Sequence, residues 1–160
     1  MKAALVLLLG CMFLPQATAA ASSPASPLVG HWAVDVSKLP MLPKDRPKSV
    51  TLDFQDATEG KWSTRVEIVD QSGGTMHSES ILPLDGTPGR ATGNYWVDIC
   101  SAKMPNPNVL VMQFAYQGNP VSTRVYSVSG DGRTLTETEA FFKKDGTPAL
   151  RTAIFTRLTQ

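Results

Sequence analysis

The sequence predicts an all-β fold in which an antiparallel up-and-down meander closes into a barrel of about eight to ten strands. Three observations lead to this prediction. Apolar side chains recur with a period of two, turn-forming residues separate the apolar stretches, and no window carries a sustained helical period. Consecutive amphipathic strands must bury one face and cover their edges, and a closed barrel satisfies both needs. A two-sheet β-sandwich is the alternative, although the chain lacks the Cys and Trp framework of immunoglobulin domains.

The expected strands follow from this alternation. In the stretch 49–54, Val50, Leu52 and Phe54 alternate with polar side chains, and β-branched and aromatic residues fill the other apolar stretches. Gly, Asp, Asn and Pro cluster between the stretches, as in Gly130-Asp131-Gly132, and favour tight turns. The strands expected on these grounds are 30–36, 49–54, 62–69, 75–82, 94–102, 109–116, 121–127, 134–142 and 150–158.

The N-terminus has the pattern of a secretory signal peptide at 1–19. Lys2 precedes an apolar stretch, and Ala17-Thr18-Ala19 supplies the small residues of a cleavage site. The apolar stretch is too short to span a bilayer, so no lasting transmembrane segment is expected. Alternatively, Leu8-Leu9-Gly10-Cys11 resembles a bacterial lipobox, in which Cys11 would be acylated. The predicted organisation is a signal peptide at 1–19, a flexible leader at 20–27 and a β-domain at 28–160.

Composition and cysteine usage restrict the functional classes. The 160 residues carry a formal net charge of +1, which falls to zero if the signal peptide is removed with Lys2. A neutral chain without a basic block lacks the electrostatic signature of a nucleic-acid-binding protein. Removal of Cys11 would leave Cys100 as the single cysteine, so no intramolecular disulfide is expected. We expect Cys100 to be a small buried apolar residue; an intermolecular disulfide or a reactive thiol is the alternative.

Two motifs resemble those of calycins, the group of lipocalin and fatty-acid-binding barrels. Gly30-His31-Trp32 opens the first strand, and Arg157 lies on the last. The resemblance implies that Trp32 plugs one end of the barrel, with Arg157 covering it through apolar and cation–π contact. The stretch from Leu28 onward also resembles uncharacterised secreted lipocalin-like domains of bacteria, which implies a periplasmic or secreted protein.

The chain departs from that group in two respects. Fatty-acid-binding proteins insert two lid helices after the first strand, whereas the segment 39–47 contains three prolines and should not form them. The long C-terminal helix and the disulfides of secreted lipocalins are also missing.

A candidate ligand-binding pair is Arg124 and Tyr126, which share one strand face and are spaced to hold a carboxylate. The pair resembles the Arg-x-Tyr of fatty-acid-binding proteins. If Val121, Thr123 and Val125 face inward instead, both side chains lie on the outer wall.

Other polar residues are less suggestive of chemistry. Glu137 and Glu139 share a face, and glycosidases use paired carboxylates, but adjacent glutamates on one strand are better explained as a solvated face paired with Arg or Lys. His31 should face outward, and His77 has no neighbouring ligand residues. We therefore expect no metal site, no cofactor and no catalytic constellation of a common type.

The aromatic residues raise the functional question. They either fill the barrel or line a cavity for a small apolar or amphipathic ligand, whose other candidate contacts are Phe54, Trp62, Tyr95 and Phe114. Non-catalytic ligand binding is the leading hypothesis. The second is an interaction or structural module of the cell envelope that has a solid core and acts through the loops 39–47, 83–94 and 101–108; an enzyme is the third. The whole set that could fill or line the barrel is Trp32, Phe54, Trp62, Tyr95, Trp96, Phe114, Phe141 and Phe155.

Overall fold

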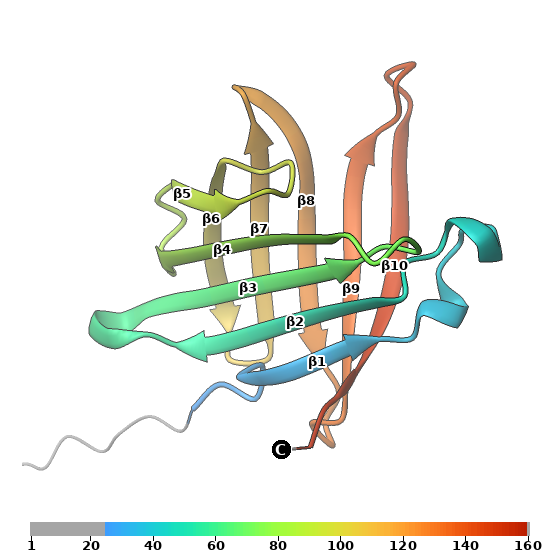
Figure 1. The fold of residues 1–160 in the computed structure, drawn as a ribbon. Helices are drawn as coiled ribbons and strands as arrows, with labels where there is room; N and C mark the ends of the chain where they lie inside the picture. Colours follow the sequence, from blue (N-terminus) through green and yellow to red (C-terminus); the bar gives the residue numbers. More distant parts are fainter. Residues whose placement is uncertain (1–24, 160) are drawn as a thin grey trace, which may run out of the picture.

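Ten antiparallel strands follow one another along the chain and close into a barrel (Figure 1). We describe residues 25–159 of a computed structural model, so the predicted signal peptide, Cys11 and most of the leader lie outside the described residues. The strands are β1 (Gly30–Val34), β2 (Ser49–Asp56), β3 (Lys61–Val69), β4 (Thr75–Pro83), β5 (Gly89–Gly93), β6 (Ile99–Asn106), β7 (Val109–Tyr116), β8 (Asn119–Val128), β9 (Thr134–Phe142) and β10 (Pro148–Arg157).

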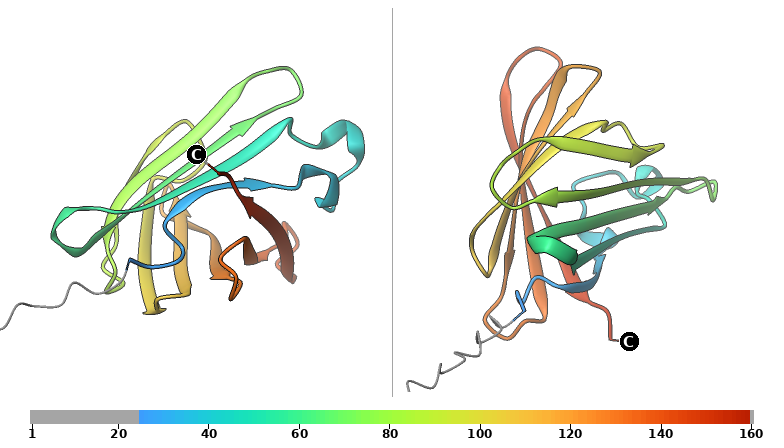
Figure 2. Two further views of the ribbon diagram at one scale, coloured as in Figure 1. Left: turned by 90° about the horizontal axis from the view of Figure 1, so that it is seen from below. Right: turned by 90° about the vertical axis from the view of Figure 1, so that its left-hand side faces the viewer.

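Strand β1 closes the barrel because it pairs on both of its edges. Trp32 lies opposite Leu52 of β2 on one side and opposite Arg157 of β10 on the other. Every other strand pairs with its sequence neighbours, so each of the ten described strands has a partner on both sides. In Figure 1, β1 to β4 run across the direction of β7 to β10, and Figure 2 shows the same crossing from two further sides. The predicted all-β barrel is confirmed, and the sandwich alternative is wrong.

The largest difference from the predicted strands is β5. Residues 83–94 were expected to form a polar loop, but Gly89–Gly93 forms a short strand between β4 and β6. Gly93 has a φ of 127°, and a Cβ there would overlap the backbone oxygen of His77 on β4. A five-residue strand that depends on such close backbone contact has little alternating pattern for sequence reasoning to detect.

The following strand also begins later than predicted. β6 starts at Ile99 rather than at residue 94, and it continues to Asn106 through the expected 101–108 loop. The preceding bend leaves Trp96 71% exposed. Trp96 therefore neither fills the barrel nor lines its interior.

Large side chains fill one end of the barrel. Trp32, Phe54, Trp62 and Tyr126 are almost completely buried. The ring centroid of Phe54 lies 5.5 Å from that of Trp62 and 5.2 Å from that of Tyr126. Such tilted and edge-to-face contacts are favourable for aromatic rings. This end of the barrel is a packed hydrophobic core.

The opposite end is covered by the segment that links β1 to β2, residues 35–48, which we call the cover segment. It contains two three-residue 3₁₀ turns, Val36–Lys38 and Pro43–Asp45, and no α-helix. A third such turn, Thr58–Gly60, joins β2 to β3. The proline-rich cover segment thus forms no lid helices, as expected from its sequence, and Figure 1 shows the segment beside the ends of β1 and β2.

Candidate functional site

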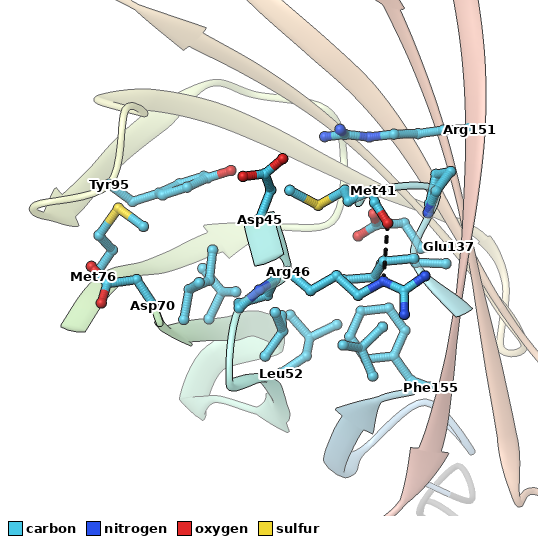
Figure 3. A pocket seen from close by; sticks show the side chains of 18 of the residues that line it. Met41, Asp45, Arg46, Leu52, Asp70, Met76, Tyr95, Glu137, Arg151 and Phe155 are labelled. Atoms are coloured by element: carbon cyan, nitrogen blue, oxygen red, sulfur yellow. Dashed lines mark hydrogen bonds between the residues drawn. The ribbon is translucent and has the colours of Figure 1, made fainter. Parts of the chain in front are cut away.

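A pocket of about 810 Å³ lies beneath the cover segment. Its walls come from strands β1 to β4, from strands β8 to β10, and from the cover segment itself. In Figure 3, Tyr95 enters from one side and Glu137, Arg151 and Phe155 from the other, with Met41, Asp45 and Arg46 of the cover segment between them. The apolar side chains that line the pocket are Val34, Leu39, Pro40, Met41, Pro47, Val50, Leu52, Val66, Ile68, Met76, Phe141, Ala153 and Phe155.

Four charged side chains form a chain of ion pairs across β8, β9 and β10. The strand register places Arg124 opposite Glu139, and Glu139 opposite Arg151. Arg124 Nη2 lies 3.3 Å from Glu139 Oε1, and Arg124 Nη1 lies 3.6 Å from Glu137 Oε2. Arg151 Nε donates a hydrogen bond to Glu139 Oε2. Both oxygens of Glu139 are therefore engaged by arginines.

The expectation of a solvated face for Glu137 and Glu139 is wrong. Their residues are 9% and 3% exposed, and the pairing with arginine takes place inside the barrel. The alternative in which Arg124 and Tyr126 lie on the outer wall is also wrong, since Arg124 lines the pocket and Tyr126 is buried. Cross-strand pairing makes this burial tolerable, because a buried charge is costly unless it has an opposite charge and hydrogen bonds.

The environment of the cluster shifts two protonation equilibria. Burial raises the pKa of Tyr126 well above its ordinary value, the Glu137 carboxylate raises it further, and Arg124 opposes the shift. Burial alone would lower the pKa of Arg124, but Tyr126 and the two glutamates raise it well above its usual range. Tyr126 is therefore a neutral phenol and Arg124 a permanent cation at neutral pH.

Arg124 also contacts an aromatic ring and has one nitrogen without a partner. Its guanidinium carbon lies 5.1 Å from the ring centroid of Phe114, a cation–π distance. Arg124 Nε is fully covered and has no hydrogen-bond partner within the described part of the chain. The guanidinium group is thus held by Phe114 on one side and by carboxylates at both terminal nitrogens.

A second, much smaller cavity of about 20 Å³ lies deeper in the barrel. Phe114, Tyr126 and Cys100 are among its lining residues, and Tyr95 and Arg124 line both cavities. Its volume is that of about one water molecule, so it holds no organic ligand. Cys100 is a free, buried cysteine as expected, and burial raises the pKa of its thiol although a hydrogen bond with Ser80 opposes the shift.

The candidate ligand contacts are divided among three environments. Arg124 and Tyr95 line the large pocket, Phe114 and Tyr126 line only the small cavity, and Phe54 and Trp62 are packed in the filled end. Of the wider aromatic set, Phe141 and Phe155 line the large pocket. Both alternatives for the aromatic residues therefore hold in part. Some of them fill one end of the barrel, and others line the pocket at the opposite end.

Sequence reasoning missed Arg151 and the contribution of the cover segment to the pocket. Arg151 lies 5.3 Å from the ring centroid of Phe141, measured from its guanidinium carbon, and is half exposed. The position of Arg151 within β10 does not indicate a pocket residue, because the side chain that holds it, Glu139, lies on β9.

His31 lies on the outer wall, where its Nδ1 is 3.5 Å from Asp53 Oδ1. Between residues 25 and 159, no three His, Cys, Asp or Glu side chains group as metal ligands would. Over the same residues, no helix is long and apolar enough to cross a membrane.

The sequence matches no protein-family model and no curated protein. The geometry of the pocket is therefore the basis on which a function is assigned.

Proposed function

We propose that this protein is an exported, lipocalin-like barrel that binds a small apolar or amphipathic molecule in the pocket beneath the cover segment without transforming it. The observation that carries the proposal is the division of the barrel interior. One end is packed with large side chains, and the other holds a pocket of about 810 Å³ with mostly apolar walls.

The size and lining of the pocket support this class of function. Pockets for small ligands measure roughly 300–1,000 Å³ and combine apolar walls with a few polar groups. Here Tyr95, Arg124 and Glu137 lie among apolar side chains from the barrel wall and from the cover segment. The lining also includes charged side chains of the cover segment and the side chain of Arg151. A ligand with an apolar body and one polar end would match this distribution.

The experiment compares two variants that add the same bulk at different places. Ala153 on β10 lines the pocket, whereas Ala140 on β9 is exposed. Decanol is titrated into the purified protein and into the Ala153→Phe and Ala140→Phe variants, and binding is followed by isothermal titration calorimetry. We expect saturable binding to the wild type and to Ala140→Phe, and an affinity at least about tenfold lower for Ala153→Phe, because a phenyl group would occupy the pocket.

A denaturation curve for each variant establishes that it is folded before binding is measured. Absence of saturable decanol binding to the wild type, or equal binding to both variants, would contradict the proposal.

A further inference from the structure

The charges at the inner end of the pocket determine which polar group a ligand can bring there. We infer that the pocket takes amphiphiles whose polar end donates hydrogen bonds, cationic ones above neutral ones, and discriminates against carboxylates. This inference rests on the proposed function and names the ligand class of the same site. It is the opposite of the carboxylate binding that the Arg124 and Tyr126 spacing alone suggested.

Arg124 is not free to bind a ligand carboxylate. Its two terminal nitrogens face Glu137 Oε2 at 3.6 Å and Glu139 Oε1 at 3.3 Å. Arg124 Nε is fully covered, so it offers no donor to the pocket. A carboxylate approaching Arg124 from the pocket would have to displace Glu137 or lie beside it, and two carboxylates in a poorly solvated site repel each other.

Glu137 presents an acceptor to the pocket. Its side chain is 11% exposed and lines the pocket, and only its Oε2 is paired with Arg124. The buried Tyr126 phenol is a further hydrogen-bond neighbour of this carboxylate. An ionised carboxylate has about four acceptor positions, so it can still accept from a ligand. A ligand ammonium or hydroxyl group would supply a further donor, and a charged donor forms the stronger hydrogen bond with a carboxylate.

The charges buried at the inner end, rather than those of the whole lining, favour the same ligands. At the mouth, Lys44 and Arg46 are matched in number by Asp45 and Asp70. In the buried cluster, one arginine, Arg124, faces two glutamates, which leaves an excess of one negative charge.

Arg151 only partly offsets this excess. Its side chain is 51% exposed, so solvent screens its charge, and its Nε is engaged by Glu139. The inner end of the pocket is therefore more favourable for a cation than for an anion.

The test uses three probes with the same alkyl chain, namely decylammonium, decanol and decanoate, titrated into the wild-type protein at neutral pH. We expect decylammonium to bind about tenfold or more tightly than decanoate, with decanol between them, since one charge-assisted hydrogen bond is gained or one repulsion added. Decanoate binding as tightly as decylammonium, or more tightly, would overturn the inference.

A matched pair of variants assigns the preference to Glu137. Glu137→Gln keeps the shape of the side chain and an acceptor oxygen but removes the charge. It should lower the affinity for decylammonium about tenfold, raise the affinity for decanoate, and change the affinity for decanol by less than about threefold. Glu79→Gln, which removes a carboxylate from an exposed ion pair with Arg65, should leave all three affinities unchanged. Equal ratios of the three affinities in the wild type and in Glu137→Gln would also overturn the inference.

The outcomes separate this inference from the proposal on which it rests. If none of the three probes binds the wild type, the proposed function fails and the inference fails with it. If decanol binds and decanoate is preferred to decylammonium, the proposed function stands and only the ligand class is wrong.

Discussion

The guanidinium carbon of Arg157 lies 4.0 Å from the centroid of the Trp32 ring, on the filled end of the barrel. Arg157 also donates hydrogen bonds to three backbone oxygens, those of Pro27, Val29 and Gly132. One side chain thus joins the segment before β1, the turn before β9 and the buried indole. Trp32 is itself fixed by a 2.9 Å hydrogen bond from its Nε1 to the oxygen of Leu28.

Replacing Arg157 by lysine should destabilise the protein although the charge is kept. The planar guanidinium group of arginine reaches three oxygens at once, and the single ammonium group of lysine cannot. We therefore expect the free energy of unfolding to fall by about 2 kcal/mol. Urea denaturation followed by tryptophan fluorescence measures the change. Arg90→Lys on the exposed surface of β5 is the control and should shift stability by less than about 0.5 kcal/mol. Equal stability of the two variants would show that Arg157 contributes only its charge.

Gly30 is required beside this arginine for a steric reason. Its φ is 141°, and a Cβ at this position would overlap Arg157 Nη1, which is held by a 2.6 Å hydrogen bond to Val29. Gly30→Ala should therefore lower the free energy of unfolding by about 1–3 kcal/mol. Gly130→Ala is the matched control, because a Cβ there would meet open space and the backbone is not in the region that favours glycine. Similar denaturation midpoints for the two variants would contradict the steric explanation.

The barrel could be predicted from the sequence because nine of its ten strands carry a local pattern of their own. Alternation such as that of Val50, Leu52 and Phe54 is local, and so are the turn residues that separate the strands. β5 lacked such a signal because Gly89–Gly93 is short and depends on contact with the backbone of His77. Local patterns therefore predicted the architecture and the strands that alternate clearly.

The site was less predictable because its charges are paired across strands. Glu137 and Glu139 have the spacing of a solvated face, and only the register with β8 and β10 shows that arginines pair with them inside the barrel. A shift of one residue in that register would reverse which side chains face inward. The position of the cover segment over the pocket is likewise a tertiary property that no residue spacing encodes.

The buried ion pairs should be costly to break. Glu139→Gln leaves Arg124 with a single carboxylate partner and Arg151 with none, so we expect a loss of about 3–5 kcal/mol in the free energy of unfolding. Glu79→Gln removes an exposed carboxylate that lies 3.0 Å from Arg65 and should cost less than about 1 kcal/mol. Chemical denaturation of both variants at neutral pH tests the difference. If Glu139→Gln lowered the free energy of unfolding no more than Glu79→Gln, the ion-pair cluster would be well solvated.

The thiol of Cys100 should be protected by burial. Its pKa is raised above the ordinary value of 9.0 chiefly by burial, so the folded state disfavours the reactive thiolate. We expect modification by a water-soluble thiol reagent to be slow in the native protein and at least about a hundredfold faster in denaturant. Modification at the same rate in both conditions would show that the thiol is accessible in the folded state.

Tyr126 gives the protein a specific dependence of stability on alkaline pH. Its pKa is raised well above the ordinary value of 10.0, first by burial and then by the charge of Glu137. The folded state therefore keeps the phenolic proton at pH values where the unfolded chain releases it. This contribution to stability is fully present below about pH 10 and is lost as the pH rises toward the folded-state pKa, with a limiting slope of about 1.4 kcal/mol per pH unit.

Tyr126→Phe should remove this part of the pH dependence. The difference in unfolding free energy between the wild type and the variant should be constant from neutral pH to about pH 9, and it should move in favour of the variant above about pH 10. Urea denaturation at a series of pH values measures the difference, and comparison of the two proteins cancels the titration of groups that they share, including Cys100. Parallel stability curves over the whole alkaline range would show that the Tyr126 hydroxyl ionises as readily in the folded protein as in the unfolded chain. In that case the small cavity beside Tyr126 would be hydrated rather than enclosed.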